Sequence, residues 1–441
     1  MALTLELQPF ADRLEAFVVS DPKWKTERAS RKVMYTYLLT HCAQGHTFVP
    51  PLHREAVITH LLNKWYDYDV LQPAMDDALT SDIQVIGDSA TILRRNGVNL
   101  DSTEATFASD KALEEFVERQ LEGTPYSFSL SDPITDAILP DGYRMNVIGG
   151  PSTRYTVQDE AGQIITKPCT IVTIRKPIYP FTLDDLVTLG SMNDDIRRYF
   201  RVMQQIGDSF LIAGGVGSAK TTLMNALTGD IPDGYKNIFI EELPEMTPLC
   251  RWAIRLTDRT HNAEGRGMIT MMRNLVNSFR MDAENEYIGE VRTPEIAHLF
   301  LRMSLSVKRQ TGTTFHAHIG FDHAVEGVLQ RFLLEATEGA GAHASTLNTA
   351  SLMTDKIRHI ITMREVKVAG ERFIRVTAIG EIVGFDAVKR ALRWAPIVEY
   401  DFDQQDWVFY GVSSDLAKRA RFEGVPCALA VTDEVREYSV Q

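Results

Sequence analysis

The sequence has few cysteines and no long apolar run, and each absence excludes a class of protein. Its four cysteines, Cys42, Cys169, Cys250 and Cys427, stand far apart and form no C-x-x-C pair. A zinc module with four cysteine ligands is therefore excluded, and the pattern fits free thiols in a reducing cytosol better than a disulfide framework. No stretch of about 18 apolar residues occurs, so we expect no membrane-spanning helix.

The sequence also lacks a surplus of basic residues. Its formal net charge is −13, which gives no chain-wide attraction for nucleic acid or anionic lipid, and no nucleic-acid partner is expected. Residues 1–17 mix acidic and apolar residues instead of forming a basic start and an apolar core, so no secretory signal is expected. The protein should reach a membrane only through partners.

The periodicity of apolar residues changes along the chain and predicts three segments. Residues 1–75 repeat apolar residues at helical spacing, with a break at Pro50-Pro51, and predict a helical N-terminal extension. Residues 76–185 predict a smaller mixed α/β domain, and residues 186–441 the main α/β domain with a C-terminal extension. The elements expected in the middle segment are strands over 82–86, 90–93, 144–148, 154–157 and 170–174, turns at 87–88 and 95–97, and a helix over 110–121 capped by Asp110.

The third segment begins after a helix that Thr182 is expected to cap. Strands and helices then alternate to about residue 385, which predicts a mostly parallel sheet with crossover helices. The residues beyond show no clear pattern.

The strongest motif is a glycine-rich turn between an apolar strand, residues 209–213, and an amphipathic helix. It matches G-x-x-x-x-G-K-[ST] in the context that this phosphate-binding motif requires. Backbone amides and the helix N-terminus would hold phosphates, Lys220 would reach the β- and γ-phosphates, and the Thr221 hydroxyl would hold Mg²⁺. The predicted nucleotide-binding residues are Gly214, Gly215, Val216, Gly217, Ser218, Ala219, Lys220, Thr221 and Thr222.

One position of this motif departs from the pattern. Ala219 stands where the last glycine is expected, and we expect the turn to keep its function if φ at Ala219 is negative. The alternatives are a glycine-rich turn without ligand, and a site that binds a nucleotide without hydrolysing it.

Acidic residues follow at two expected strand ends. Glu241 and Glu242 end the strand that begins at Asn237, where a carboxylate could organise Mg²⁺, although a solvated strand end is the alternative. Glu290, in Tyr287-Ile-Gly-Glu-Val-Arg292, is suited to polarise water, and a surface pair with Arg292 is the alternative.

Histidines follow in Thr314-Phe-His-Ala-His318. His316 is expected to sense the γ-phosphate or to hydrogen-bond Glu290. A structural histidine is the alternative, and a zinc site of His316, His318 and His323 is a third reading that no convincing ligand spacing supports.

The order of these segments resembles the secretion ATPases of the type II/type IV superfamily, above all the Tad/Cpa-type pilus ATPases and the conjugation-type secretion ATPases. The resemblance runs from about Asp82 to Phe385. The segments that carry it besides the phosphate loop are Leu139-Pro-Asp-Gly-Tyr-Arg-Met-Asn-Val147, Thr173-Ile-Arg-Lys176, Ile240-Glu-Glu-Leu-Pro-Glu245, Asn262-Ala-Glu-Gly-Arg-Gly267, Leu275 to Arg292 and Thr314-Phe-His-Ala317.

The resemblance implies a fold, an activity and site roles. It implies a RecA-like P-loop NTPase domain preceded by a PAS-like α/β domain. The activity implied is that of an ATP-hydrolysing motor, with ATP and Mg²⁺, working as a homohexameric ring at the inner membrane with a platform component of a secretion or pilus machine. Glu241 and Glu242 would be acids contacting water and Mg²⁺, Glu290 the catalytic glutamate and His316 the sensor. Arg144 and Arg175 would stabilise phosphoryl oxygens, with ordinary surface ion pairs as the alternative.

The chain departs from the family pattern at several of these positions. Ala219 and Glu242 replace a glycine and an aspartate, Ala283-Glu284 replaces Pro-Asp, and Asn285-Glu286 puts polar residues into a strand that is normally apolar. The first histidine of the histidine box is missing, with Lys308 or Arg309 near its place. These departures motivate a second hypothesis, a hydrolysis-deficient nucleotide-binding regulator. A DNA translocase, the third, would need a basic channel.

Overall fold

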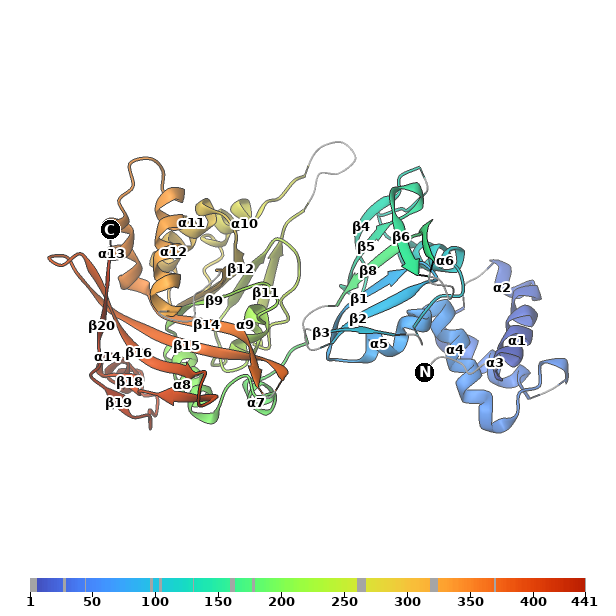
Figure 1. Cartoon of the computed structure of the whole chain (residues 1–441), viewed down its shortest axis with the longest axis horizontal. Coiled ribbons are helices and arrows are strands. Elements are labelled where there is room, and N and C mark those ends of the chain that lie inside the picture. The colour runs from blue at the N-terminus through green and yellow to red at the C-terminus, as the bar shows by residue number, and fades with distance from the viewer. Residues whose placement is uncertain are drawn as a thin grey trace. The chain divides into compact units, whose positions relative to one another are not determined.

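A computed structural model describes residues 6–26, 29–43, 45–95, 98–102, 105–129, 131–158, 163–176, 179–259, 267–317, 324–368 and 370–440. The chain divides into two compact units, Met1–Pro177 and Ile178–Gln441, and each has hydrophobic cores of its own (Figure 1). The finer division at about residues 76 and 186 stays a prediction.

The first unit begins with helices, as the apolar periodicity predicts. Leu14 and Val18 pack with Leu38, Leu61 and Leu62 into a separate small core. The helical elements of this stretch are α1 (Gln8–Ser20), α2 (Lys23–Thr26), α3 (Arg31–His41), η1 (Gly45–Thr47), η2 (Pro51–His53), α4 (Arg54–Tyr66), η3 (Asp69–Leu71) and α5 (Gln72–Asp76).

An antiparallel sheet with the strand order β3-β2-β1-β8-β5-β4 follows. The first two strands pair across the turn predicted at 87–88, in which Gly87 has φ +52°. The elements are β1 (Thr80–Ile86), β2 (Ala90–Arg95), β3 (Val98–Asp101), α6 (Asp110–Leu121), β4 (Ile134–Ile138), β5 (Arg144–Ile148), η4 (Gly150–Ser152), β6 (Arg154–Gln158), β7 (Ile164–Pro168) and β8 (Ile171–Arg175). The turn predicted at 95–97 falls partly outside the described residues.

The cap predicted for α6 is wrong by one residue. Ser109 is the N-cap, and its hydroxyl accepts a hydrogen bond from the backbone N–H of Ala112. Asp110 is the first helical residue, and its carboxylate instead accepts a hydrogen bond from the backbone N–H of Thr170 at 2.8 Å. Asp110 therefore joins the helix to the start of β8.

The second unit is built on a large mixed sheet with the order β11-β10-β12-β13-β9-β14-β15-β16-β17, to which β20 adds by pairing with β16. The strands from β11 to β14 pair in parallel. The elements are α7 (Leu183–Thr188), α8 (Asp194–Ile206), β9 (Ser209–Gly214), α9 (Lys220–Thr228), β10 (Asn237–Glu241), β11 (Ala253–Thr257), α10 (Met271–Ser278), β12 (Asn285–Val291), α11 (Pro294–Ser306), β13 (Gln310–His316), α12 (Ala324–Gly339), α13 (Thr346–Lys356), β14 (Ile357–Val368), β15 (Glu371–Asp386), β16 (Ala391–Asp401), β17 (Asp406–Phe409), β18 (Val412–Ser413), α14 (Ser414–Phe422), β19 (Val431–Thr432) and β20 (Arg436–Ser439).

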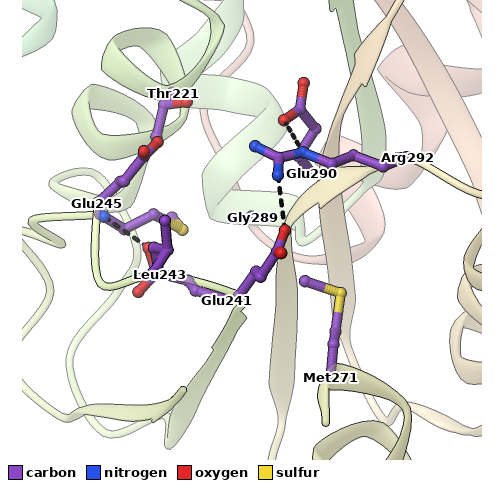
Figure 2. Close-up of a pocket in the computed structure, with 10 residues that line it drawn as sticks. Thr221, Glu241, Leu243, Glu245, Met271, Gly289, Glu290 and Arg292 are labelled. Carbon is purple, nitrogen blue, oxygen red and sulfur yellow. Dashed lines mark hydrogen bonds and ion pairs between the residues drawn. The ribbon is translucent and has the colours of Figure 1, made fainter. Parts of the chain in front are cut away.

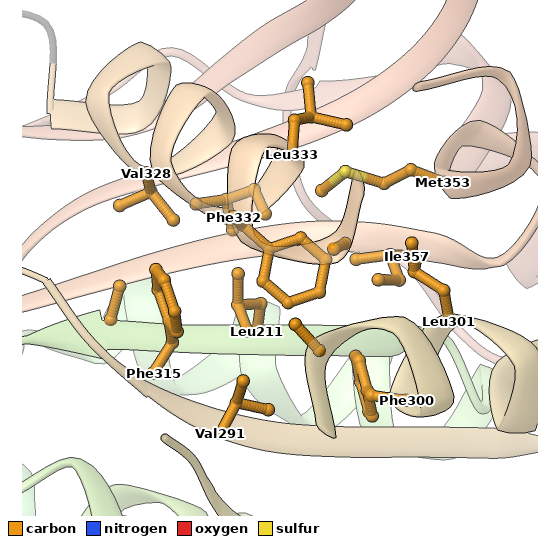
Figure 3. Packing of buried hydrophobic residues seen from close by; sticks show 14 of the residues in the cluster. Leu211, Val291, Phe300, Leu301, Phe315, Val328, Phe332, Leu333, Met353 and Ile357 are labelled. Carbon is orange, nitrogen blue, oxygen red and sulfur yellow. The ribbon is translucent and has the colours of Figure 1, made fainter. Parts of the chain in front are cut away.

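Helices cover both faces of this sheet because successive side chains of a strand point to opposite faces. In β9, Leu211 joins the core under α11 and α12, whereas Phe210 joins the core under α8 and α9. Figure 3 shows the first of these cores, in which Phe300 and Phe332 pack over the sheet. The fully buried β9 is thereby fixed on both sides, which fixes the turn that follows it.

Two expectations for this unit meet different outcomes. Thr182 caps α7 through a capping box with Asp185, as predicted. The alternation predicted to about residue 385 is wrong beyond β14, because β14, β15 and β16 form a long antiparallel meander. These three strands are buried on both faces over much of their length, so their apolar runs do not differ from those of parallel strands between helices.

A buried polar cluster connects α14 to the sheet. Asp208 is 8% exposed, and its Oδ2 lies 2.8 Å from His359 Nε2 and 2.7 Å from Arg419 Nη2. His359 Nδ1 lies 2.6 Å from the hydroxyl of Tyr199, and Arg419 also binds the fully buried Glu381 at 2.9 Å. The cluster therefore joins α8, β9, β14, β15 and α14 by charged hydrogen bonds.

Candidate nucleotide site

The phosphate-loop motif occupies the turn between β9 and α9. Glycine is required at Gly214, since a Cβ there would lie 2.4 Å from the carbonyl oxygen of Met363 and from Ser218 Oγ. Gly217 adopts φ +72°, a conformation that glycine reaches without steric cost. The N-terminus of α9 has no side-chain cap, so its first backbone N–H groups point into the turn without a partner in the helix. This is the arrangement that binds an anion.

Lys220 is folded over the turn. Its Nζ donates to the carbonyl oxygens of Gly214 at 3.1 Å and Gly215 at 2.9 Å, and the residue is 8% exposed. Burial lowers the pKa of Lys220, and the nearby charge of Glu290 opposes that change. The ammonium group is thus held at the turn and next to an acid from a different strand.

The condition of a negative φ at Ala219, under which the turn was expected to keep its function, is not met. Ala219 is the N-cap of α9 with φ +57° and ψ +31°, the left-handed conformation. A Cβ in this conformation crowds the following carbonyl group and costs about 1–2 kcal/mol. The turn therefore keeps the geometry that a glycine would give it, under strain.

The parallel pairing explains why the predicted residues converge. The carboxyl ends of parallel strands lie at one edge of a sheet, and ligands of such folds bind there. Glu241 ends β10, Glu290 stands near the end of β12, and His316 ends β13. His316 also pairs in register with Gly214 at the start of the phosphate loop.

Glu241 is held in place by its neighbours. It is 2% exposed, and its carboxylate accepts hydrogen bonds from the backbone N–H of Met246 at 2.6 Å and from Arg255 at 3.1 and 3.2 Å. Burial raises the pKa of Glu241, and Arg255 and the hydrogen bond from Met246 counteract part of that rise. Arg255 of the neighbouring strand β11 is thus the ionic partner of Glu241.

Arg292 joins the other two acids. Its Nε lies 2.7 Å from Glu290 Oε2 and its Nη1 lies 2.6 Å from Glu242 Oε2. The hydrogen bond to Glu290 raises the pKa of Arg292. The Glu290–Arg292 pair expected as an alternative is thus present, but it also includes Glu242. The spacing of two residues, which puts side chains on one face of a strand, could have indicated this contact.

His316 lies beside Glu290 without bonding to it. Its Nδ1 is 4.0 Å from Glu290 Oε1, beyond hydrogen-bond distance, and its side chain is 44% exposed. The hydrogen bond expected as one role of His316 is therefore not formed in this structure. His318 and His323, named for the zinc alternative, lie outside the described residues.

One small pocket brings most of these side chains together. It has a volume of about 40 Å³, and Thr221, Glu241, Glu242, Glu290 and Arg292 line it (Figure 2). That volume admits a few water molecules or a hydrated ion, since one water needs about 10–15 Å³ of such space. A hydroxyl and carboxylates are the donors that Mg²⁺ prefers, and it usually takes one or two carboxylates beside phosphate and water. The residues therefore fit the expected metal.

The two predicted arginines of the first unit lie side by side. Arg144 of β5 and Arg175 of β8 are paired in register. Arg144 binds Asp136 at 2.9 Å, and Arg175 binds Asp82 at 2.9 Å. Both arginines therefore form ion pairs, as expected under the alternative to a role in stabilising phosphoryl oxygens.

Comparison with known proteins defines the class. The family model described as "Type II/IV secretion system protein" matches residues 67–334, and the chain belongs to this family of secretion ATPases. Over 364 residues it is 24% identical to an uncharacterized protein of Methanocaldococcus jannaschii, covering 80% of this chain and 60% of that relative's length. Over 214 residues it is 27% identical to the type IV secretion system protein VirB11 of Brucella suis biovar 1, covering 44% of this chain and 56% of the other.

A solved structure shares the fold. The Legionella pneumophila ATPase DotB is similar with a TM-score of 0.50 and 19% identity, over 69% of this chain and 78% of that one. At that identity the likeness shows the mixed α/β fold alone. Across the part of the chain that the structure describes, no helix is both long and apolar enough to span a bilayer.

Proposed function

We propose that this chain hydrolyses ATP and drives a secretion or type IV-like pilus machine. The observation that carries the proposal is the pocket in which Thr221 of the phosphate-loop helix meets Glu241, Glu242 and Glu290 from two neighbouring strands. A phosphate-binding turn beside carboxylates is what in-line transfer of a phosphoryl group to water requires. Family membership supports the same activity.

Each residue then has a task that its position supports. The turn from Gly214 to Thr222 holds the phosphates through backbone N–H groups, and Lys220 leaves the two carbonyl oxygens to contact the β- and γ-phosphates. Thr221 and, through water, Glu242 would hold Mg²⁺, which neutralises phosphate charge when bound. Once Arg292 releases the Glu290 carboxylate, that carboxylate accepts the proton of the attacking water. His316 senses the γ-phosphate.

The larger assembly is part of the proposal. We propose a RecA-like ATPase domain, preceded by a PAS-like domain and a helical extension, in a cytoplasmic homohexamer at the inner membrane. Its partner is a platform component of the machine. Arg144 and Arg175 stabilise the phosphoryl oxygens, for which forked guanidinium groups are suited.

The test is Mg²⁺-dependent ATP hydrolysis by the full chain beside Lys220→Ala and Glu290→Gln, with the particle mass measured in ATP. Turnover that both substitutions abolish, on a six-subunit particle, supports the motor. Arg144→Ala and Arg175→Ala should lower kcat more than they change ATP binding, whereas unchanged kcat in both would return them to the role of surface ion pairs.

A hydrolysis-deficient regulator is the second candidate, and one observation favours it. Arg292 occupies both Glu290 and Glu242, the two acids that hydrolysis would use. A chain that binds ATP and forms a ring without turnover would support this function over the motor, as would turnover that Ala219→Gly restored, whereas normal turnover in the natural chain would exclude it.

A further inference from the structure

A second and larger cleft lies away from the phosphate loop. It has a volume of about 630 Å³ and runs between α10 and α11, which lie side by side in Figure 1. Val276, Phe279 and Leu299 form apolar walls, and Glu286 and Ser278 line it as well. Glu286 stands near the start of β12, whereas Glu290 stands near its end, so the cleft opens at the opposite edge of the sheet from the nucleotide site.

The carboxyl group of Glu286 has unused hydrogen-bonding capacity. Glu286 is 3% exposed, and within the part of the chain that the structure describes its one hydrogen-bond partner is Ser278, at 3.0 Å. The same Ser278 hydroxyl lies 2.9 Å from the carbonyl oxygen of Leu275. A hydroxyl has one proton, so it serves only one of these two acceptors at a time. Burial of the carboxyl group raises the pKa of Glu286.

The neighbouring cations leave this acid unpaired. Lys308 lines the cleft, but its ammonium group lies 2.5 Å from Asp282, which neutralises it. Arg302 lines the cleft from α11, and no ion pair joins it to Glu286 in the described structure. A cationic group that entered the cleft would therefore meet an acid able to accept its hydrogen bonds, in a setting that favours a charged pair over an isolated charge.

The apolar surface continues outside the cleft. Val276 of α10 and Phe279 at its C-terminal end are 49% and 43% exposed, and Met272 of α10 and Leu305 of α11 are 37% and 39% exposed. A small amine would fill the cleft and leave this surface in water. A protein segment with a basic residue between apolar residues would cover both, and exposed apolar side chains beside a pocket are typical of interaction sites.

We propose that the cleft between α10 and α11 binds a segment of a partner protein, with an arginine or lysine of that segment on Glu286 and its apolar neighbours on Val276 and Phe279. The site includes Glu286, one of the two polar residues at the start of β12. It does not depend on hydrolysis, and its occupant leaves the phosphate loop free.

The test uses the full chain and three fluorescent peptides that differ at one central position, flanked by leucine and phenylalanine. The central residue is arginine, its neutral isostere citrulline, or glutamate. The arginine peptide should bind at least about tenfold more tightly than the citrulline peptide, because a hydrogen bond to a charged group contributes that much. Glu286→Gln should remove this ratio while the variant keeps its thermal midpoint.

Controls separate the proposal from its alternatives. Phe279→Ala should weaken all peptides, whereas Leu334→Ala, a 54% exposed residue of α12 outside the cleft, should change none. Excess MgATP should not displace the arginine peptide. Any one of four outcomes would overturn the proposal. These are equal binding of the arginine and citrulline peptides, tightest binding of the glutamate peptide, displacement of the arginine peptide by MgATP, and no binding at millimolar concentration. Arginine amide binding as tightly as the peptide would overturn the assignment to a protein segment.

Discussion

The buried cluster around Asp208 should make a large contribution to the stability of the second unit. Burial alone would raise the pKa of Asp208, but the hydrogen bond and charge of His359 and the charge of Arg419 outweigh it and lower the pKa to about 2. Relative to an unfolded-state pKa near 3.8, that depression corresponds to about 2 kcal/mol of stability. Replacing Asp208 also leaves the buried His359 without its acid and leaves Arg419 with Glu381 and Asp415, and removing one partner of a buried pair costs up to about 3–5 kcal/mol.

Asp208→Asn keeps an acceptor oxygen, so we expect it to lower the free energy of unfolding by about 2–4 kcal/mol. Asp415→Asn is the matched control, since Asp415 binds the same Arg419 but its side chain is 50% exposed, and an exposed pair contributes about 0–1 kcal/mol. Urea unfolding at neutral pH, followed by tryptophan fluorescence, measures both. Equal losses for the two variants would refute the argument that burial makes the Asp208 cluster strong.

The pH dependence of this contribution has a definite sign. A depressed pKa in the folded state adds stability above the unfolded pKa, and that stability is lost as pH falls through the folded pKa. The difference in stability between the natural chain and Asp208→Asn should therefore be constant above about pH 5 and shrink between about pH 4 and pH 2. A difference that grew on acidification would contradict the assignment of the effect to the Asp208 carboxylate.

Three further changes test local features. Ala219→Gly should be at least as stable as the natural chain. The glycine relieves about 1–2 kcal/mol of backbone strain in the folded state, which offsets the about 0.4–1 kcal/mol by which its greater conformational freedom favours the unfolded state. Ala226→Gly, in right-handed backbone of the same helix, should instead lose about 1 kcal/mol in the same urea titration. Ser109→Ala should cost about 1 kcal/mol through loss of the α6 cap, and an unchanged urea midpoint would return that role to Asp110. Arg292→Ala should lower the Mg²⁺ concentration needed for nucleotide binding, measured by calorimetry, because it removes a cation from two acids of the pocket. Arg331→Ala, which breaks a remote exposed pair with Glu335, should not change that requirement.

The sequence predicted the features that depend on contiguous residues. The strand, turn and helix of the phosphate loop are adjacent in the chain, so periodicity and glycine spacing located them. The convergence of Glu241, Glu290 and His316 followed from one further rule, that parallel strands present their carboxyl ends at one edge. The pairing of β1 with β2 and the cap at Thr182 are local signals of the same kind.

Features that depend on distant partners could not be predicted in this way. The backbone at Ala219 is set by the turn as a whole, and the sequence shows only that the residue is not glycine. Glu286 is recognised as unusual in a strand, but its burial follows from the packing of α10 and α11. The choice between Ser109 and Asp110 as a cap depended on Thr170, which is distant in the sequence and competes for the Asp110 carboxylate.

The departures from the family pattern occupy two places in the fold. Ala219 and Glu242 lie at the candidate nucleotide site, where the alanine keeps a left-handed turn and the glutamate reaches Arg292. Asn285 and Glu286 lie at the other end of the strand that carries Glu290. Asn285 is fully buried and binds Asn237 and Arg309, so its polar group is satisfied within the fold, whereas Glu286 keeps unused capacity facing a cleft. A buried acid whose one described side-chain partner is a serine hydroxyl is costly to fold, which is consistent with the ligand that we propose for it. The two neighbouring residues therefore differ, because the polar group of Asn285 is satisfied within the fold whereas Glu286 is the residue that we propose to bind a partner segment.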